Sequence, residues 1–346
     1  MKKNNRSKDS RIEWVDSAKA LACILVVLGH LLQSILVITP TSIIGSVRFI
    51  NWYIYLLHMP LFMCLSGFMY SYKSRIKSVN DYKKFELKKA CNLIIPYVTF
   101  YSITMILNMA FTNYVNSPKG IQEWLGMLNN PISPYWFLYA LLSIFIVVPL
   151  LEKLFKNKKI VMIVFTIMKI VSIFYSTKIY VIDSIAIYGI YFYIGVFIKD
   201  SMIKEKKKLY FIGYILYFIC AILIYKYVYP YQKNMKLIYS LITILMAVIG
   251  TIVSINICKC TKSNVLMNSY KKYTFQVYLM HTIFAAGTRI LLYVIGVRNW
   301  YIHFVLGMIA SIYIPVLISH ISNKLKITNF FFFPSKTMEE YRKVGN

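Results

Sequence analysis

Acidic residues are scarce in this chain of 346 residues. Only 12 are Asp or Glu, against 40 Lys and Arg, so the formal net charge is +28. Charged residues make up just 15% of the chain and hydrophobic residues 58%, and the mean hydropathy is +0.58. A soluble domain normally carries about 25% charged residues, and disordered chains are marked by low hydrophobicity. The composition therefore excludes both classes and favours a membrane protein with many spans.

Cysteines and the motifs of soluble enzymes are also sparse. Four of the six cysteines lie in apolar runs, where a thiol usually serves packing, and Cys258 and Cys260 form an isolated C-x-C. Neither arrangement predicts a disulfide framework or a metal site. The chain contains no Walker A motif, G-x-G-x-x-G, G-x-S-x-G or H-E-x-x-H. Their absence argues against ATP-driven transport and membrane proteolysis.

Long apolar runs, by contrast, fill the chain. A membrane helix needs about 20 mostly apolar residues, and ten such runs occur, at 17–38, 47–70, 91–112, 134–151, 160–176, 179–198, 209–228, 237–256, 275–296 and 301–321. The sequence thus predicts an all-α, polytopic membrane helix bundle of about 10 transmembrane helices. Its expected divisions are a basic N-terminal tail (1–16), a transmembrane domain (17–321) and a C-terminal tail (322–346). The FFFF run at 330–333 is predicted to anchor that tail at the membrane surface.

Basic residues alternate between the two sides of this predicted bundle. Thirty of the 40 lie in the N-terminal tail, in every second connection and after the last run, whereas the other connections carry five. Because Lys and Arg concentrate in cytoplasmic loops, both termini are predicted to be cytoplasmic. The same dispersal over six segments explains the net charge through the bilayer, so no nucleic-acid partner is expected.

Ionisable residues inside membrane spans are costly and usually functional. The first run contains three, Asp16, Lys19 and His30. Lys19 and His30 are 11 positions apart, about 16.5 Å along one helix face, and Asp16 precedes Lys19 by one turn. A base in mid-membrane and a cation at the cytoplasmic end would suit catalysis. The alternative is that Asp16 and Lys19 are interfacial residues and His30 a packing histidine.

Further polar residues mark the later runs. His58 lies in the second run, and the ninth contains His281 followed eight positions later by Arg289. These side chains could line one cavity with the histidine of the first run, or they could serve helix packing. His303 and His320 lie near the ends of the tenth run, where interfacial roles are expected.

Five phrases in order resemble the membrane-bound acyltransferase family 3, in particular its fucose-4-O-acetylase-like bacterial branch. They are Asp16 with Lys19 and His30 at the family spacing, HMPLFMCLSGF at 58–68, KKACNLIIPY at 88–97, WFL at 136–138 and YLMH at 278–281. Two positions depart from the family pattern. Lys19 stands where arginine is commoner, which keeps the charge but loses the bidentate fork. Asn92 stands where many relatives carry a second loop arginine.

The resemblance implies transfer of an acyl group, most often acetyl, from acyl-CoA to a hydroxyl of a cell-surface polysaccharide or its lipid-linked precursor. His30 would be the general base, or a transient acyl acceptor, assisted by Lys19 and Asp16. The remaining implied site residues are Lys88 and Lys89 for the CoA phosphates, and His58, Trp136, His281 and Arg289 for the acceptor. Acetyl-CoA or another acyl-CoA would be a donor substrate, with no permanently bound cofactor and no metal.

The resemblance also implies the surroundings of the protein. A multi-pass location in the bacterial plasma membrane is expected, with polysaccharide-assembly proteins as further partners and a capsular or other surface glycan as the acceptor. Two rival functions remain. One is a polysaccharide or lipid exporter component without acyl transfer, which does not need His30. The other is a membrane scaffold, which tolerates changes at both Lys19 and His30.

Overall fold

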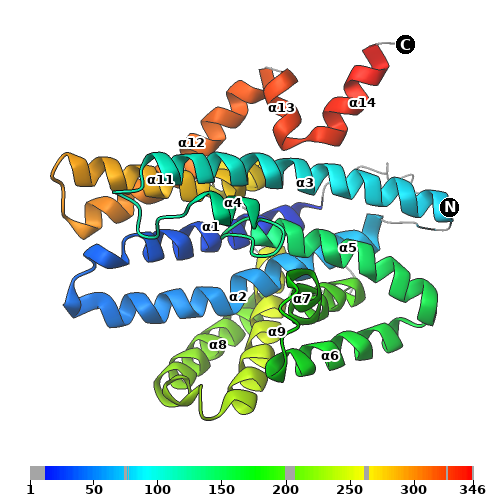
Figure 1. The fold of residues 1–346 in the computed structure, drawn as a ribbon. Coiled ribbons are helices and arrows are strands. Elements are labelled where there is room, and N and C mark those ends of the chain that lie inside the picture. Colours follow the sequence, from blue (N-terminus) through cyan, green and yellow to red (C-terminus); the bar gives the residue numbers. More distant parts are fainter. Residues whose placement is uncertain are drawn as a thin grey trace.

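The computed structural model describes residues 12–73, 76, 78–198, 207–260, 265–324 and 326–344, and no strand occurs among them. Figure 1 shows the long helices gathered into one bundle. The α-helices are α1 (Glu13–Ser34), α2 (Thr41–Lys73), α3 (Val79–Ala110), α4 (Ile121–Leu125), α5 (Trp136–Phe155), α6 (Lys158–Phe174), α7 (Tyr180–Phe197), α8 (Lys207–Tyr227), α9 (Lys236–Cys260), α10 (Val265–Tyr270), α11 (Thr274–Val294), α12 (Trp300–Lys324), α13 (Lys326–Phe332) and α14 (Pro334–Val344). The predicted all-α class is confirmed.

Each of the ten predicted runs coincides with one of these helices. Within the described residues, nine helical segments are long and apolar enough to cross a membrane, and they contain α1, α2, α3, α5, α7, α8, α9, α11 and α12. The remaining predicted run, 160–176, corresponds to α6, which has 17 residues. That length spans about 25 Å, slightly less than the hydrocarbon core of about 30 Å. The cytoplasmic placement of both termini stays a prediction.

Local capping explains where several helices begin. Ser78 precedes α3 and accepts a hydrogen bond from the backbone of Asp81, whose carboxylate accepts one from the Ser78 backbone in return. This reciprocal pair satisfies two backbone donors that the helix start would otherwise leave unpaired. The Asn157 side chain caps α6, and the Asn299 side chain accepts from two backbone amides at the start of α12. The polar residues between the apolar runs thus set the helix starts.

The closest helix packing occurs between α2 and α7. A Cβ atom added at Gly67 would overlap the carbonyl oxygen of Phe192, and one added at Gly195 would overlap that of Cys64. The two backbones therefore touch directly, which only residues without a side chain allow in a membrane bundle. α1 packs against α2, α9, α11 and α12, so the helix with the predicted catalytic residues lies inside the bundle.

The segment between α3 and α5 folds back along α3 (Figure 1). The Tyr97 hydroxyl donates to the carbonyl of Met127, and the Tyr101 hydroxyl donates to that of Glu123 at 2.8 Å. Tyr97 lies 13 positions before the end of α3, so the segment descends about 20 Å beside the helix. Irregular backbone at membrane depth must be satisfied by protein groups, and tyrosine hydroxyls supply those hydrogen bonds here.

The C-terminal helices α13 and α14 lie against the outside of α3 (Figure 1). Phe332 is buried, and its ring lies 5.3 Å from that of Phe100. The Phe333 ring lies 6.4 Å from that of Phe275. The prediction that this phenylalanine run anchors the tail in the lipid surface is therefore wrong for these two rings, because they pack against the helix bundle itself.

Candidate functional site

Three histidines that are far apart in the sequence meet inside the bundle. The ring centroids of His30 on α1 and His281 on α11 are 5.1 Å apart. The Tyr55 ring on α2 joins the third histidine to this pair, at 6.1 Å from His30 and 4.7 Å from His58. We call His30, Tyr55, His58 and His281 the histidine cluster. The structure thus brings together three of the predicted site residues.

Exposure and hydrogen bonding separate the three histidines. His58 is 2% exposed and His281 is fully buried, whereas His30 keeps an accessible surface. The Nδ1 atom of His58 lies 2.6 Å from the carbonyl oxygen of Ile54, and that of His281 lies 2.7 Å from that of Tyr278. A carbonyl only accepts, so both Nδ1 atoms donate, and a neutral ring then leaves Nε2 as an acceptor.

His30 is held by packing rather than by hydrogen bonds. Within the described residues, its ring lies beside those of His281 and Tyr55, and no hydrogen bond engages its ring nitrogens. A general base needs a nitrogen within hydrogen-bond reach of the proton that it abstracts. Of the three histidines, His30 is therefore the one that combines accessible surface with ring nitrogens that no backbone carbonyl engages.

Sequence reasoning missed Tyr55 and gave no separate role to Tyr278, which it noted only as part of the YLMH phrase. Tyr55 precedes His58 by three positions, and Tyr278 precedes His281 by three, so that Y-L-x-H occurs twice in the chain. Residues three apart lie on the same face of a helix. The repeat could therefore have indicated that both histidines have an aromatic neighbour. The Tyr278 hydroxyl donates to the carbonyl of Pro134, which links this face to the segment before α5.

Asp16 and Lys19 lie in the first turns of α1, at the opposite end of that helix from His30. The axial separation between Lys19 and His30 is about 16.5 Å. Both charged side chains are half-buried. The structure therefore keeps them on the same helix as the base but does not place them within contact of it.

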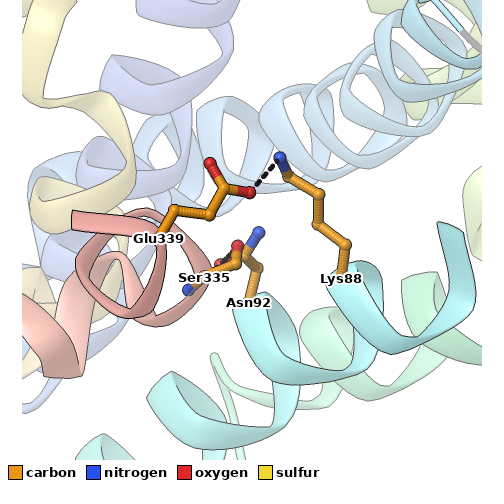
Figure 2. A network of polar contacts seen from close by, with 4 residues as sticks. All are labelled: Lys88, Asn92, Ser335 and Glu339. Carbon is orange, nitrogen blue, oxygen red and sulfur yellow. Dashed lines mark hydrogen bonds and ion pairs between the residues drawn. The ribbon is translucent and has the colours of Figure 1, made fainter. Parts of the chain in front are cut away.

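The predicted donor-site cation Lys88 is engaged by the C-terminal helix. Its ammonium lies 3.2 Å from the carboxylate of Glu339, and both side chains are about 60% exposed. Figure 2 shows this ion pair. One turn further along α3, the Asn92 side chain accepts hydrogen bonds from the backbone and hydroxyl of Ser335. Asn92, which the resemblance sets at a position where many relatives carry arginine, thus contacts the start of α14.

The neighbouring Lys89 lies over aromatic rings. Its ammonium is 3.9 Å from the centre of the Phe145 ring on α5 and 5.5 Å from that of Phe85. A cation over an aromatic face is attracted to the ring quadrupole. Glu86 lies nearby with its two carboxylate oxygens buried and without a hydrogen-bond partner among the described residues. The two adjacent lysines therefore occupy different environments.

Two further predicted substrate residues lie outside the histidine cluster. Arg289 is buried and donates to the carbonyl of Tyr114, 2.9 Å away, so it ties α11 to the segment after α3. Trp136 begins α5, and its ring stacks on that of Tyr188 with the centroids 5.0 Å apart. Trp136 and Tyr55 line one cavity of about 650 Å³. The cavity thus connects Trp136 with the cluster, whereas Arg289 serves a backbone contact.

The two histidines of α12 differ from each other. His303 is buried, with Nε2 2.9 Å from the carbonyl oxygen of Val297. His320 is exposed, and its ring hydrogen-bonds the Tyr273 hydroxyl at 3.0 Å. Only His320 has the exposed position expected of an interfacial histidine. Among the described residues, no group of three His, Cys, Asp or Glu side chains is placed to hold a metal ion.

The amino-acid sequence matches a known family over most of its length. Residues 12–320 match the family described as "Acyltransferase domain". This chain belongs to the acyltransferase family 3. Together with its apolar helices, the match makes it an integral membrane protein of that family.

This chain is similar to two proteins named nodulation protein NolL. The protein from Sinorhizobium fredii is 33% identical over 145 residues, which cover 40% of this chain and 35% of the relative. The protein from Mesorhizobium japonicum is 29% identical over 140 residues, which cover 39% of this chain and 35% of the relative. The matched stretch thus spans about a third of each relative. No solved structure matches this chain.

Proposed function

We propose that this membrane protein transfers an acyl group, in the simplest case acetyl from acetyl-CoA, to a hydroxyl of a cell-surface polysaccharide or its lipid-linked precursor. The observation that carries the proposal is the histidine cluster, in which His30 alone among the three histidines keeps accessible surface. Membership of the acyltransferase family supports the reaction class.

The chemistry requires a base because a sugar hydroxyl is a weak nucleophile. In the proposed step, a ring nitrogen of His30 takes the hydroxyl proton while the hydroxyl oxygen attacks the thioester carbonyl carbon. The C–S bond then breaks, and the imidazolium returns the proton to the departing CoA sulfur. The Nδ1 atoms of His58 and His281 donate to backbone carbonyls, so the Nε2 atoms of these two neighbouring rings are acceptors.

The donor would enter from the opposite end of the bundle, where Asp16 and Lys19 begin α1 and Lys88 and Lys89 lie on α3. That end contains the basic connections, and a cytoplasmic location there would suit CoA phosphates. The acceptor would reach His30 from the other side. This arrangement corresponds to a protein of the bacterial plasma membrane with cytoplasmic termini.

The decisive experiment compares the surface glycan of cells that lack the gene with cells complemented by the wild-type chain or by His30→Gln. We expect the glycan mass to fall by one acyl group per modified site in the deletion strain. Only the wild-type chain should restore it. If glycan reaches the surface only when the gene is present, with no change in acylation, the exporter function replaces the proposed one.

A further inference from the structure

The cavity beside Tyr55 has the features of a binding site for a charged ligand. Its volume is about 650 Å³, within the range of small-molecule sites. Side chains from α2, α5, α6, α7 and α9 line it. It therefore lies between helices that are far apart in the chain, and no residue assigned above to the donor contributes to it.

The charged side chains that line this cavity are all positive. Lys169 on α6 and Lys236 at the start of α9 line it, together with serine and threonine hydroxyls, and no Asp or Glu is among its lining residues. The Lys169 ammonium lies 5.7 Å from the centre of the Tyr191 ring. No salt bridge to a described carboxylate engages either lysine. Lys169 is half-buried within α6, where an ammonium group is costly without a partner, whereas Lys236 is exposed at the start of α9.

An aromatic wall faces the same space. Trp136 and Tyr188 are stacked at 5.0 Å with an angle of 29° between the rings, and both line the cavity. Flat aromatic surfaces offer large contact areas to the apolar face of a ligand, while a few polar groups fix its orientation. A pyranose ring has such an apolar C–H face and hydroxyls at its edge.

One wall of the cavity adjoins the proposed base. Tyr55 lines it, and the Tyr55 ring is 6.1 Å from His30. Lys169 lies in the last two turns of α6, and Lys236 begins α9. Both lysines are on the side of the bundle away from the start of α1. A ligand seated on Trp136 could therefore present a hydroxyl toward the histidine cluster.

We propose that this cavity binds the acceptor and that the acceptor is an anionic saccharide, whose carboxylate or phosphate is held by Lys169 and Lys236 while a sugar ring lies on Trp136. That the bound saccharide is the acceptor rests on the proposed function. The binding itself can be measured without any acyl transfer. Lysine recognises carboxylate and phosphate as a point charge, so both chemistries fit the pair.

The test measures the binding of three glucose-based probes to the full chain in detergent by saturation-transfer NMR. The probes are methyl β-glucuronide, glucose 1-phosphate and the neutral methyl β-glucoside. We expect at least one anionic probe to bind about tenfold or more tightly than the neutral one, since charge-assisted hydrogen bonds are the strong ones. The anionic probe that binds more tightly identifies a carboxylate or a phosphate as the anion recognised.

Variants connect this binding to the two lysines. Lys169→Gln and Lys236→Gln should each weaken the anionic probe about tenfold, and Lys169→Arg should restore most of the affinity. Lys226→Gln is the matched control, because Lys226 also lies over a tyrosine ring, 5.1 Å from that of Tyr227, but outside this cavity. Equal binding of all three probes, or unchanged affinity in both glutamine variants, would overturn the inference.

The same measurement separates the two proposals. His30→Gln should bind the anionic probe as the wild type does, because His30 does not line the cavity. Loss of glycan acylation in His30→Gln, with no anionic binding in the wild type, would uphold the acyltransferase and reject the anionic site. Selective anionic binding by a chain that acylates nothing would uphold the site and reject the transferase.

Discussion

Among the individual residues, accessibility distinguishes His30 from its neighbours. His58 and His281 are each tied to a backbone carbonyl one turn earlier, and both are buried. A histidine in that setting fills space and satisfies its own donor. His30 is half-buried and has no such backbone hydrogen bond, which is why we propose it as the base.

Replacing His30 by Gln tests this difference directly. Gln keeps part of the volume and hydrogen-bonding capacity but cannot take up a proton near neutral pH. Because general-base assistance contributes roughly 10²–10⁴-fold, transfer to glycan should fall by about that factor while the amount of inserted protein is unchanged. Acylation is measured by glycan mass and insertion by membrane immunoblot.

His320→Gln is the control for this variant. His320 is exposed and contacts the Tyr273 hydroxyl, whereas His303 is buried and its loss could disturb packing. We expect transfer by His320→Gln to be near the wild-type rate. A wild-type rate in His30→Gln would reject His30 as the base.

The proposed contact of Lys88 with acyl-CoA can be tested with variants of Lys88 and of its ion-pair partner Glu339. Lys88→Gln should raise the KM for acyl-CoA about tenfold, because one charged contact to phosphate is worth about 1.5–3 kcal/mol. Glu339→Gln should leave that KM unchanged or lower it, since it removes the carboxylate that engages Lys88. The KM is measured with purified protein and a soluble acceptor.

The stability of both variants should stay close to that of the wild type, because exposed ion pairs contribute about 0–1 kcal/mol. If Glu339→Gln raises the KM as much as Lys88→Gln does, the pair serves to hold α14 on α3. Lys88 would then not be a donor contact.

At the level of helices, the contact between α2 and α7 is the most sensitive to a small change. Gly195→Ala would place a methyl group against the Cys64 carbonyl, and Gly67→Ala would do the same at Phe192. Such overpacking costs about 1–3 kcal/mol. Each variant should therefore lower the thermal unfolding midpoint in detergent by several degrees.

Gly287→Ala is the matched control for these glycines. It also lies in a helix, α11, but a Cβ added there meets nothing within 4 Å. Alanine favours the helix over glycine by about 1 kcal/mol, so this variant should keep or raise the midpoint. A similar loss of stability in all three variants would mean that close backbone packing is not the reason.

At the level of the whole molecule, the alternation of charge predicts which end faces the cytoplasm. A cysteine in place of Ser117, which is exposed in the segment after α3, should react with an impermeant reagent added outside the cell. A cysteine in place of Lys84, exposed near the start of α3, should react only after the cells are opened. Ser78 is less suitable because it caps α3.

The label is compared with that of the parent chain, because Cys220 is exposed. Labelling of the Lys84→Cys chain in intact cells, with protection of Ser117→Cys, would reverse the orientation. The donor would then have to reach the histidine cluster from the other side, and the assignment of Lys88 and Lys89 to CoA would fail.

The sequence by itself determined the helical class, the ten apolar segments and the residues of the histidine cluster except Tyr55. These properties are local, because an apolar run of about 20 residues and a capping residue act on their own helix. The family phrases are also short, and each lies within one or two neighbouring segments.

Only the tertiary structure decided which residues meet. His30 and His281 are 251 positions apart, and their contact depends on how α1 packs against α11. Helix packing also decides that Arg289 donates to a backbone carbonyl, that Asn92 contacts α14 and that the Phe332 ring packs on α3. Helix packing follows from the shapes of many side chains at once, so no single segment of sequence contains that information.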